Sequence, residues 1–166
     1  MLHAEVVGRA ERWSSAVALV DAATGRSLRY GDLVDGVRRF AGALRARGAQ
    51  PGDVLGIVAF NALEFPIAMH GALAAGLTVA PASPLLTARE LSAFLRQAGA
   101  RYAVADAESL EKVTGVEEVF ALEALPMGSP LDFAGGDPEA LAVLFSTSGT
   151  TGLPRAPRTP TRARWR

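Results

Sequence analysis

Short apolar runs alternate with amphipathic stretches along most of this 166-residue chain. Apolar residues recur at helical spacing from Leu33 to Leu44 with charged residues between them, and Gly48 follows as a stop, which predicts a helix. The continuous apolar run Val54–Phe60 comes after a Pro-Gly turn and is typical of a strand buried on both faces. This alternation indicates an α/β fold with a mostly parallel sheet flanked by helices.

The same patterning predicts six further strands and three further helices. Strands are expected at residues 16–20, 27–30, 77–80, 101–105, 116–120 and 141–145. Helices are expected at residues 61–75, 87–98 and, as a short one, 109–114. Residues 125–137, rich in Pro, Gly and Ser, predict a surface connection.

Helix ends carry recognisable capping patterns. Thr87 with Glu90 has the spacing of a capping box, and Gly99 supplies a stop for the same helix. Asn61 with Glu64 resembles a second capping arrangement. We therefore interpret Glu64 and Glu90 as caps rather than catalytic acids, and His70, among alanines on a predicted helix, as a packing or surface residue.

Composition excludes much metal and thiol chemistry. There is no cysteine, so the chain has no disulfide framework, thiolate zinc site or cysteine nucleophile, and His3 and His70 alone cannot form a metal centre. The first residues lack a basic segment followed by an apolar one, and the longest weakly polar stretch, residues 66–83, is interrupted by His70, glycine and proline. The expectation is a cytoplasmic protein without a membrane span.

Candidate chemistry lies in the loop Ser146–Arg155, directly after the last predicted strand. It holds two glycines, five hydroxyl side chains and one arginine. Glycine lets backbone N–H groups approach phosphate oxygens, hydroxyls donate hydrogen bonds to them, and arginine adds a permanent positive charge. The spacing is not that of a Walker A loop. From composition alone, a plain surface turn remains an equal alternative to a polyphosphate site.

The segment Thr147–Arg155 resembles the signature of the AMP-forming adenylating enzymes, which are the acyl- and aryl-CoA synthetases, the adenylation domains of peptide synthetases and the luciferases. Further segments resemble the same family over roughly residues 10 to 155: Tyr30–Leu33, Pro51–Val54, Asn61–Pro66, Gly71–Gly76 and Pro84–Leu91. The resemblance implies part of the N-terminal domain of an acyl-CoA synthetase-like fold.

The resemblance also implies a site and a reaction. The residues that it assigns to the β- and γ-phosphates of ATP are Thr147, Ser148, Gly149, Thr150, Thr151, Gly152 and Arg155. The family usually has lysine at the last position. The implied substrates are a carboxylic acid and ATP with Mg²⁺, which give an acyl-adenylate, and coenzyme A as the acceptor of the acyl group. No nucleic-acid partner is implied.

The sequence departs from the family pattern at one residue and in one segment. Arg29 stands where the family usually has a Ser or Thr helix cap. After Arg155 the family continues with glycine and an apolar strand, whereas this chain reads Ala156–Arg166 with four arginines and no acid. We therefore divide the chain into a truncated AMP-binding N-terminal domain, residues 1–155, and a basic disordered tail, residues 156–166. The family's magnesium-, ribose- and lysine-bearing motifs are absent from this sequence, so no catalytic residue is assigned.

The basic tail admits three interpretations. An arginine-rich segment can bind nucleic acid or an acidic membrane, although four arginines and one tryptophan without a folded basic face are a weak signal. It can be a plain solvated tail. The third, which we favour, is a lost reading frame near codon 155, because off-frame reading of G+C-rich DNA yields chiefly Arg, Pro and Ala.

These observations support one main functional hypothesis and two alternatives. The main one is an AMP-dependent acid-CoA ligase for fatty or aromatic acids, present as a fragment that does not catalyse the reaction. The first alternative is a non-catalytic remnant that binds nucleotide weakly or serves as an interaction fragment. The second is a fragment of a peptide-synthetase adenylation domain.

Overall fold

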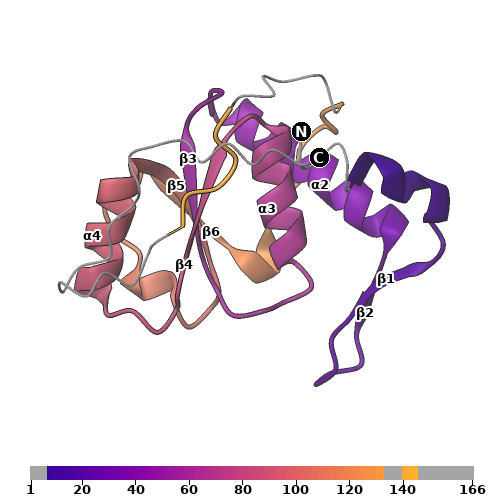
Figure 1. The fold of residues 1–166 in the computed structure, drawn as a ribbon, viewed down its shortest axis with the longest axis horizontal. Coiled ribbons are helices and arrows are strands. Elements are labelled where there is room, and N and C mark those ends of the chain that lie inside the picture. Colours follow the sequence, from indigo (N-terminus) through magenta and orange to yellow (C-terminus); the bar gives the residue numbers. More distant parts are fainter. Residues whose placement is uncertain (1–6, 133–139, 146–166) are drawn as a thin grey trace, which may run out of the picture.

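The computed structural model describes residues 7–132 and 140–145, and its centre is a four-stranded sheet (Figure 1). The strands are β3 (Val54–Val58), β4 (Thr78–Ala82), β5 (Ala100–Ala105) and β6 (Glu118–Ala121). Their order across the sheet is β4-β3-β5-β6, and every neighbouring pair is parallel. The α/β fold with a parallel sheet predicted from the sequence is thereby confirmed.

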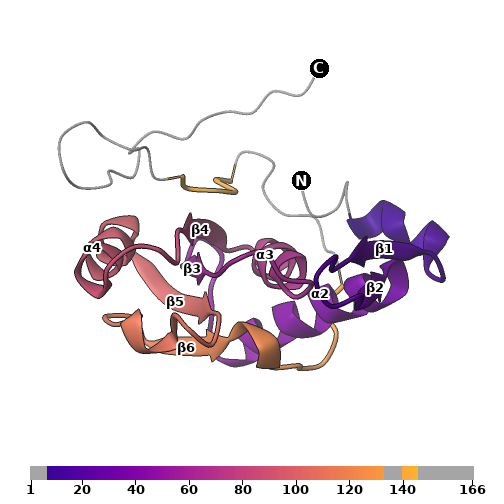
Figure 2. The same ribbon diagram turned by 90° about the horizontal axis from the view of Figure 1, so that it is seen from below.

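Helices cover both faces of this sheet (Figure 2). The helices α2 (Tyr30–Ala46) and α3 (Phe65–Ala74) pack on one face, in a core with Leu55 and Ile57 of β3. The helix α4 (Ala88–Ala98) packs on the other, in a second core that contains Val58 of the same strand. Of the apolar run predicted as a strand buried on both faces, residues 54–58 form the strand β3, whose residues 55–58 are buried, while Phe60 at the end of the run is exposed.

A separate antiparallel hairpin stands beside α2, away from the four-stranded sheet (Figure 1). It consists of β1 (Val17–Val20) and β2 (Ser27–Arg29), close to the two strands predicted there. An ion pair of 2.6 Å between Arg26 and Glu64 joins the hairpin to the residue before α3. Residues 7–10 are helical, and there are three short 3-10 helices in the described residues: η1 (Glu11–Trp13), η2 (Leu110–Lys112) and η3 (Leu122–Ala124).

The capping box of α4 is present as predicted. The Thr87 hydroxyl accepts the Glu90 N–H at 3.3 Å, and the Glu90 carboxylate accepts the Thr87 N–H at 2.9 Å. The hydrogen bond from the Thr87 side chain lowers the pKa of Glu90. The helix ends at Gly99, whose φ of 70° lies in the left-handed region that favours glycine. Arg29 occupies the N-cap position of α2 and makes no side-chain capping hydrogen bond.

Three sequence predictions are wrong in detail. The helix expected from Asn61 begins at Phe65, and no side chain caps it: Pro66 fits the first helical turn, while Glu64 bonds to Arg26 instead. The short helix expected at residues 109–114 is only the 3-10 turn η2. The strand expected at residues 77–80 is displaced to 78–82, because the Leu77 N–H donates to the Ala72 carbonyl as α3 ends.

Residues 125–132, part of the predicted surface connection, lie against α2 with close backbone contact. The N–H of Gly128 donates to the Arg39 carbonyl, and the N–H of Leu131 donates to the Arg38 carbonyl, each at 3.0 Å. A Cβ atom on Gly42 of α2 would collide with the Ser129 carbonyl oxygen. This crossing therefore requires glycine at position 42.

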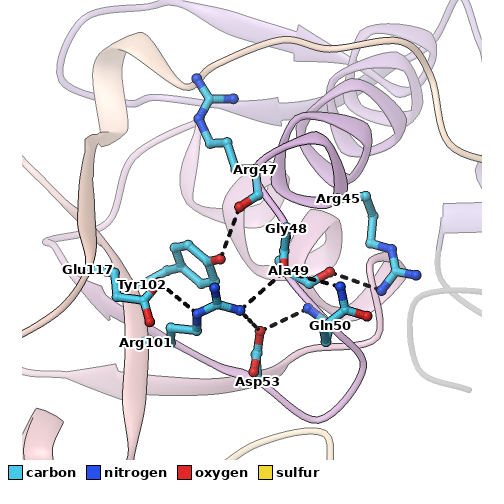
Figure 3. Close-up of polar contacts among 9 residues, drawn as sticks. All are labelled: Arg45, Arg47, Gly48, Ala49, Gln50, Asp53, Arg101, Tyr102 and Glu117. Carbon is cyan, nitrogen blue, oxygen red and sulfur yellow. Dashed lines mark hydrogen bonds and ion pairs between the residues drawn. The ribbon is translucent and has the colours of Figure 1, made fainter.

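A polar cluster ties the amino ends of the strands together (Figure 3). The Arg101 guanidinium donates to the Asp53 carboxylate at 2.8 Å, to the Glu117 carboxylate at 2.8 Å and to the Gly48 carbonyl at 3.1 Å. It also lies 5.0 Å from the centre of the Tyr102 ring. Hydrogen bonds to both carboxylates raise the pKa of Arg101, and burial raises the pKa of Tyr102. The cluster joins the end of α2 to the starts of β3, β5 and β6.

Asp53 is the anionic centre of this cluster. Its partial burial alone would raise the pKa of the carboxyl, but hydrogen bonds from the Gln50 N–H and from Arg101 outweigh burial and bring the pKa below its ordinary value. A group with a lowered pKa in the folded state stabilises the fold above its unfolded-state pKa. That contribution disappears as the pH falls through the folded-state value.

We predict that Gly42→Ala lowers the free energy of unfolding by about 2 kcal/mol or more, because the new methyl group overlaps the Ser129 carbonyl. Alanine has a higher helix propensity than glycine, so the steric overlap must lower the stability by more than this propensity raises it. The control is Gly8→Ala, also in a helical segment, where a Cβ meets nothing within 4 Å. Urea unfolding of both variants provides the measurement, and equal midpoints would contradict the proposed contact.

We predict that Asp53→Asn costs about 1 kcal/mol of stability at pH 7, because a charge-assisted hydrogen bond to Arg101 is lost. The difference from the wild type shrinks as the pH falls below about 4, the unfolded-state pKa, and through the lower folded-state pKa of the carboxyl. Urea midpoints between pH 3 and pH 7 measure this. Glu117→Gln, at a more exposed carboxylate, serves as the control with an expected cost of only a few tenths of a kcal/mol. A pH-independent gap for Asp53→Asn would refute the assignment.

Candidate functional site

The carboxyl ends of the parallel strands meet at one edge of the sheet, which makes this edge the candidate site. At this edge the chain leaves β3 through Phe60, β4 through Ser83 and β5 through Asp106. From β3 the connection leads to β4, and from β5 it leads to β6, so two neighbouring strands send the chain in opposite directions. In open α/β sheets, ligands bind outside the carboxyl ends of the strands at such points.

Residues 140–145 lie beside β4 and extend the sheet in the parallel direction. Val143 forms a parallel bridge with Val79. The Val79 N–H donates to the Ala142 carbonyl at 2.9 Å, and the Leu144 N–H donates to the Val79 carbonyl at 2.8 Å. The strand predicted at residues 141–145 is thus a single bridge rather than a full strand, but its place and direction agree with the prediction.

This direction carries the chain towards the carboxyl edge at Phe145, and the glycine- and hydroxyl-rich loop follows immediately in the sequence. The predicted phosphate-binding residues Thr147, Ser148, Gly149, Thr150, Thr151, Gly152 and Arg155 lie outside the described residues. The tail 156–166 lies outside them as well. The structure therefore describes the segment that leads to this loop, residues 140–145, and the loop itself is outside the described residues.

Sequence reasoning missed Asp106, which organises the same edge. This carboxylate is buried, accepts the Phe60 N–H at 2.9 Å through one oxygen and accepts the Ser109 N–H at 3.0 Å through the other. It joins the end of β5 to the exit from β3. The signal that was available is an acid placed directly after a buried apolar strand.

Exposed apolar side chains accompany these polar groups. Phe60 and Phe145 follow the sheet segments, and Leu85 lies in the connection after β4, with exposed fractions of 51%, 63% and 79%. The carboxyl edge thus combines backbone ends, a buried carboxylate and uncovered apolar groups.

A shallow pocket of about 360 Å³ lies between the end of β1 and the residues before α3. Its lining is mainly apolar, with Asp21 and Asn61 as polar members. The Asp21 carboxylate is occupied by its own turn: a hydrogen bond from the Thr24 hydroxyl and one from the Ala23 N–H lower its pKa. This pocket therefore offers a fixed anion and apolar walls, without a second titratable group on which acid-base chemistry could rely.

His70 and Glu90, the remaining titratable residues considered in the sequence, both lie in helical elements. His70 lies half-buried in α3, and Glu90 belongs to the capping box. Within residues 7–132 and 140–145, no three His, Asp or Glu side chains come together in a group that could hold a metal ion. In the same part of the chain, no helix is both long enough and apolar enough to cross a membrane.

Comparison with known proteins agrees with this architecture. The family model described as AMP-binding enzyme matches residues 7–156. The chain is 29% identical over 175 residues to 4-coumarate–CoA ligase 3 of Arabidopsis thaliana, covering 93% of this chain and 31% of that protein. It is 31% identical over 137 residues to the nonribosomal peptide synthase roqA of Penicillium rubens, covering 78% of this chain and 6% of that protein.

A solved structure shows the same fold. The long-chain-fatty-acid-CoA ligase FadD1 of Archaeoglobus fulgidus superposes with a TM-score of 0.82 at 22% identity, covering 93% of this chain and 35% of that one. The chain therefore spans about a third of the length of these two CoA ligases. Because the family model extends over most of the sequence, from the start of the described fold through the glycine-rich loop, the chain belongs to the AMP-binding enzyme family.

Proposed function

We propose that this chain forms the polyphosphate-binding part of an AMP-forming ligase that joins a carboxylic acid to a thiol. The observation that supports the proposal is the parallel pairing of Val143 with Val79 of β4, which directs residues 140–145 towards the carboxyl edge of the sheet, and Thr147–Arg155 follows this segment in the sequence. Ligand-binding loops of α/β sheets occupy this place. Membership of the AMP-binding enzyme family agrees with a nucleotide as the ligand.

In the proposed reaction an oxygen of the carboxylate attacks the α-phosphorus of ATP, which is bound as its Mg²⁺ complex. The bond to the bridging oxygen breaks, so that pyrophosphate leaves and an acyl-adenylate forms. A thiol, which we propose to be that of coenzyme A, then displaces AMP. The substrate supplies the nucleophile in the first step, so no serine or cysteine nucleophile is required of the protein.

The task proposed for the loop is electrostatic. Thr147, Ser148, Thr150 and Thr151 supply hydroxyl donors, Gly149 and Gly152 allow close approach of backbone N–H groups, and Arg155 supplies charge. Donors placed around the β- and γ-phosphates stabilise the charge that builds up on leaving pyrophosphate. Arginine in place of the family's usual lysine keeps the charge and presents it as a planar fork rather than a point.

For the acid we propose a fatty or aromatic carboxylate, since the similar CoA ligases are named for 4-coumarate and long-chain fatty acids. The match to a nonribosomal peptide synthase favours an amino acid as the second candidate. An adenylation assay on a protein that carries the complete domain distinguishes these two candidates, because only the correct class of acid stimulates the reaction. The present chain contributes its phosphate loop to either reaction.

We predict that ATP and inorganic tripolyphosphate, each with Mg²⁺, raise the melting temperature of the purified chain, whereas AMP does so less, because it lacks the β- and γ-phosphates. At a hundred times the dissociation constant the expected stabilisation is about 2.7 kcal/mol. Arg155→Ala weakens tripolyphosphate binding about tenfold, since a charge-assisted contact is lost, and Arg155→Lys retains most of it.

Arg162→Ala, which removes an arginine of the tail outside the signature, is the matched control for Arg155→Ala. Equal losses in the two variants would indicate nonspecific attraction to basic residues. Absence of any stabilisation of the wild-type chain by tripolyphosphate would refute the proposed phosphate site.

We further predict that the 166-residue chain alone shows no acid-dependent exchange between ATP and pyrophosphate, because its sequence lacks the family's later adenylate- and lysine-bearing motifs. The measurement uses labelled pyrophosphate with 4-coumarate and with a long-chain fatty acid. A full-length CoA ligase of the family is the positive control. Acid-stimulated exchange by the purified chain would overturn this prediction.

A further inference from the structure

The pocket beside the hairpin has walls from two segments that are far apart in the sequence. One wall is the end of β1 with the two residues after it, and the other is the connection from β3 to α3. The apolar lining includes Leu19 and Val20 on the first wall and Leu63, Phe65 and Pro66 on the second. The volume of about 360 Å³ is at the lower end of the roughly 300–1,000 Å³ usual for small-molecule sites. These walls fit a small ligand with an apolar body.

Asp21 places a negative charge in this lining. A hydrogen bond from the Thr24 hydroxyl and one from the Ala23 N–H lower the pKa of its carboxyl, so the group is ionised at neutral pH. Within residues 7–132 and 140–145 this carboxylate forms no ion pair, because the guanidinium of Arg26 pairs with Glu64 instead, at 2.6 Å. The pocket therefore contains an anion whose charge has no direct partner in the described part of the chain.

The turn occupies the Asp21 carboxylate only in part. An ionised carboxylate has about four lone-pair positions. Its Oδ1 atom accepts the Ala23 N–H at 2.9 Å and the Thr24 N–H at 3.4 Å, and its Oδ2 atom accepts the Thr24 hydroxyl at 2.6 Å. Oδ2 can therefore accept one further donor. Because the same bonds already hold the side chain in one orientation, little rotamer freedom is lost when that donor arrives.

The other polar groups of the two walls differ in what they can offer a ligand. Glu64 is engaged by Arg26, and this ion pair joins the hairpin wall to the wall before α3. Asn61, expected from the sequence to cap a helix, does not cap α3, and its side-chain amide makes no hydrogen bond to the described residues. An amide of this kind has two N–H donors and one acceptor oxygen. Asp21 and Asn61 are thus the polar groups of the lining that can meet a ligand.

We propose that this pocket binds a small organic cation, a primary ammonium group on an aryl or alkyl body. One of the three ammonium donors meets the remaining position of the Asp21 carboxylate, and the body lies between the apolar walls. The charge of Asp21 selects the cation over a neutral molecule or an anion of the same shape. The inference goes beyond the proposed function and does not depend on it, since all residues of the pocket lie before the glycine-rich loop.

The test is a titration of the full 166-residue chain with 2-phenylethylammonium at constant ionic strength, followed by the amide NMR signals. We expect saturable shifts at residues 19–22 and 61–65, with a dissociation constant on the order of 10 mM for a ligand of this size. The neutral analogue 2-phenylethanol should bind roughly threefold more weakly, because solvent screens a partly exposed charge. The anion 3-phenylpropionate should bind more weakly still.

Asp21→Asn removes the charge and keeps an oxygen that accepts the Ala23 N–H, so the turn is retained. This variant should bind the ammonium ion no better than the alcohol. Asp35→Asn is the matched control, since it makes the same change at an exposed carboxylate of α2 that is paired with Arg39. The roughly threefold preference for the ammonium ion should remain in this control.

Val20→Ser tests the apolar wall, because Val20 is 62% exposed and its replacement spares the core. It should weaken the binding of the ammonium ion and of the alcohol alike, by about twofold. Equal affinity of the wild type for the ammonium ion and the alcohol would overturn the inference. A preference that survives Asp21→Asn, or shifts confined to residues outside the two walls, would overturn it as well.

Discussion

The parallel pairing of β3 with both β4 and β5 is the constraint on which the rest of the structure depends. A parallel sheet needs apolar cover on both faces, which explains why α2 and α3 lie on one side and α4 on the other. It also collects all carboxyl ends at one edge and all amino ends at the other. The molecule uses the two edges differently, since Arg101 and its carboxylates close the amino edge, while the carboxyl edge keeps apolar groups uncovered.

Local sequence was sufficient where neighbours in the chain determine the structure. The capping box of Thr87 and Glu90, the left-handed stop at Gly99 and the buried strand β3 all depend on residues a few positions apart. The start of α3 at Phe65 rather than at Asn61 could not be predicted, because Glu64 finds a partner in Arg26, which is 38 residues away. Asp106 escaped for the same reason, since one of its partners, Phe60, is 46 residues distant.

The candidate site divides in the same way. The residue types of the loop, with glycines, hydroxyls and an arginine, suit a phosphate site, and it is the resemblance of Thr147–Arg155 to the family signature that favours this over a plain surface turn. The place of residues 140–145, which precede the loop, depends on contacts that no local pattern reveals, such as the bond from Thr78 to Leu141 across 63 residues. Sequence therefore supplies a hypothesis for what the loop binds, whereas the contacts of the segment before the loop come from the fold.

The hairpin of β1 and β2 has a practical consequence for labelling the protein. Residues 22–27 at its tip are exposed, and the Asp21 carboxylate organises the turn through bonds to Ala23 and Thr24. The tip stands clear of the four-stranded sheet, and its ion pair with Glu64 is largely solvent-exposed on the arginine side. Exposed tips with few buried contacts tolerate insertions. A fluorophore or short peptide epitope placed between Ala23 and Gly25 would thus report on the protein without entering its core or the carboxyl edge of the sheet.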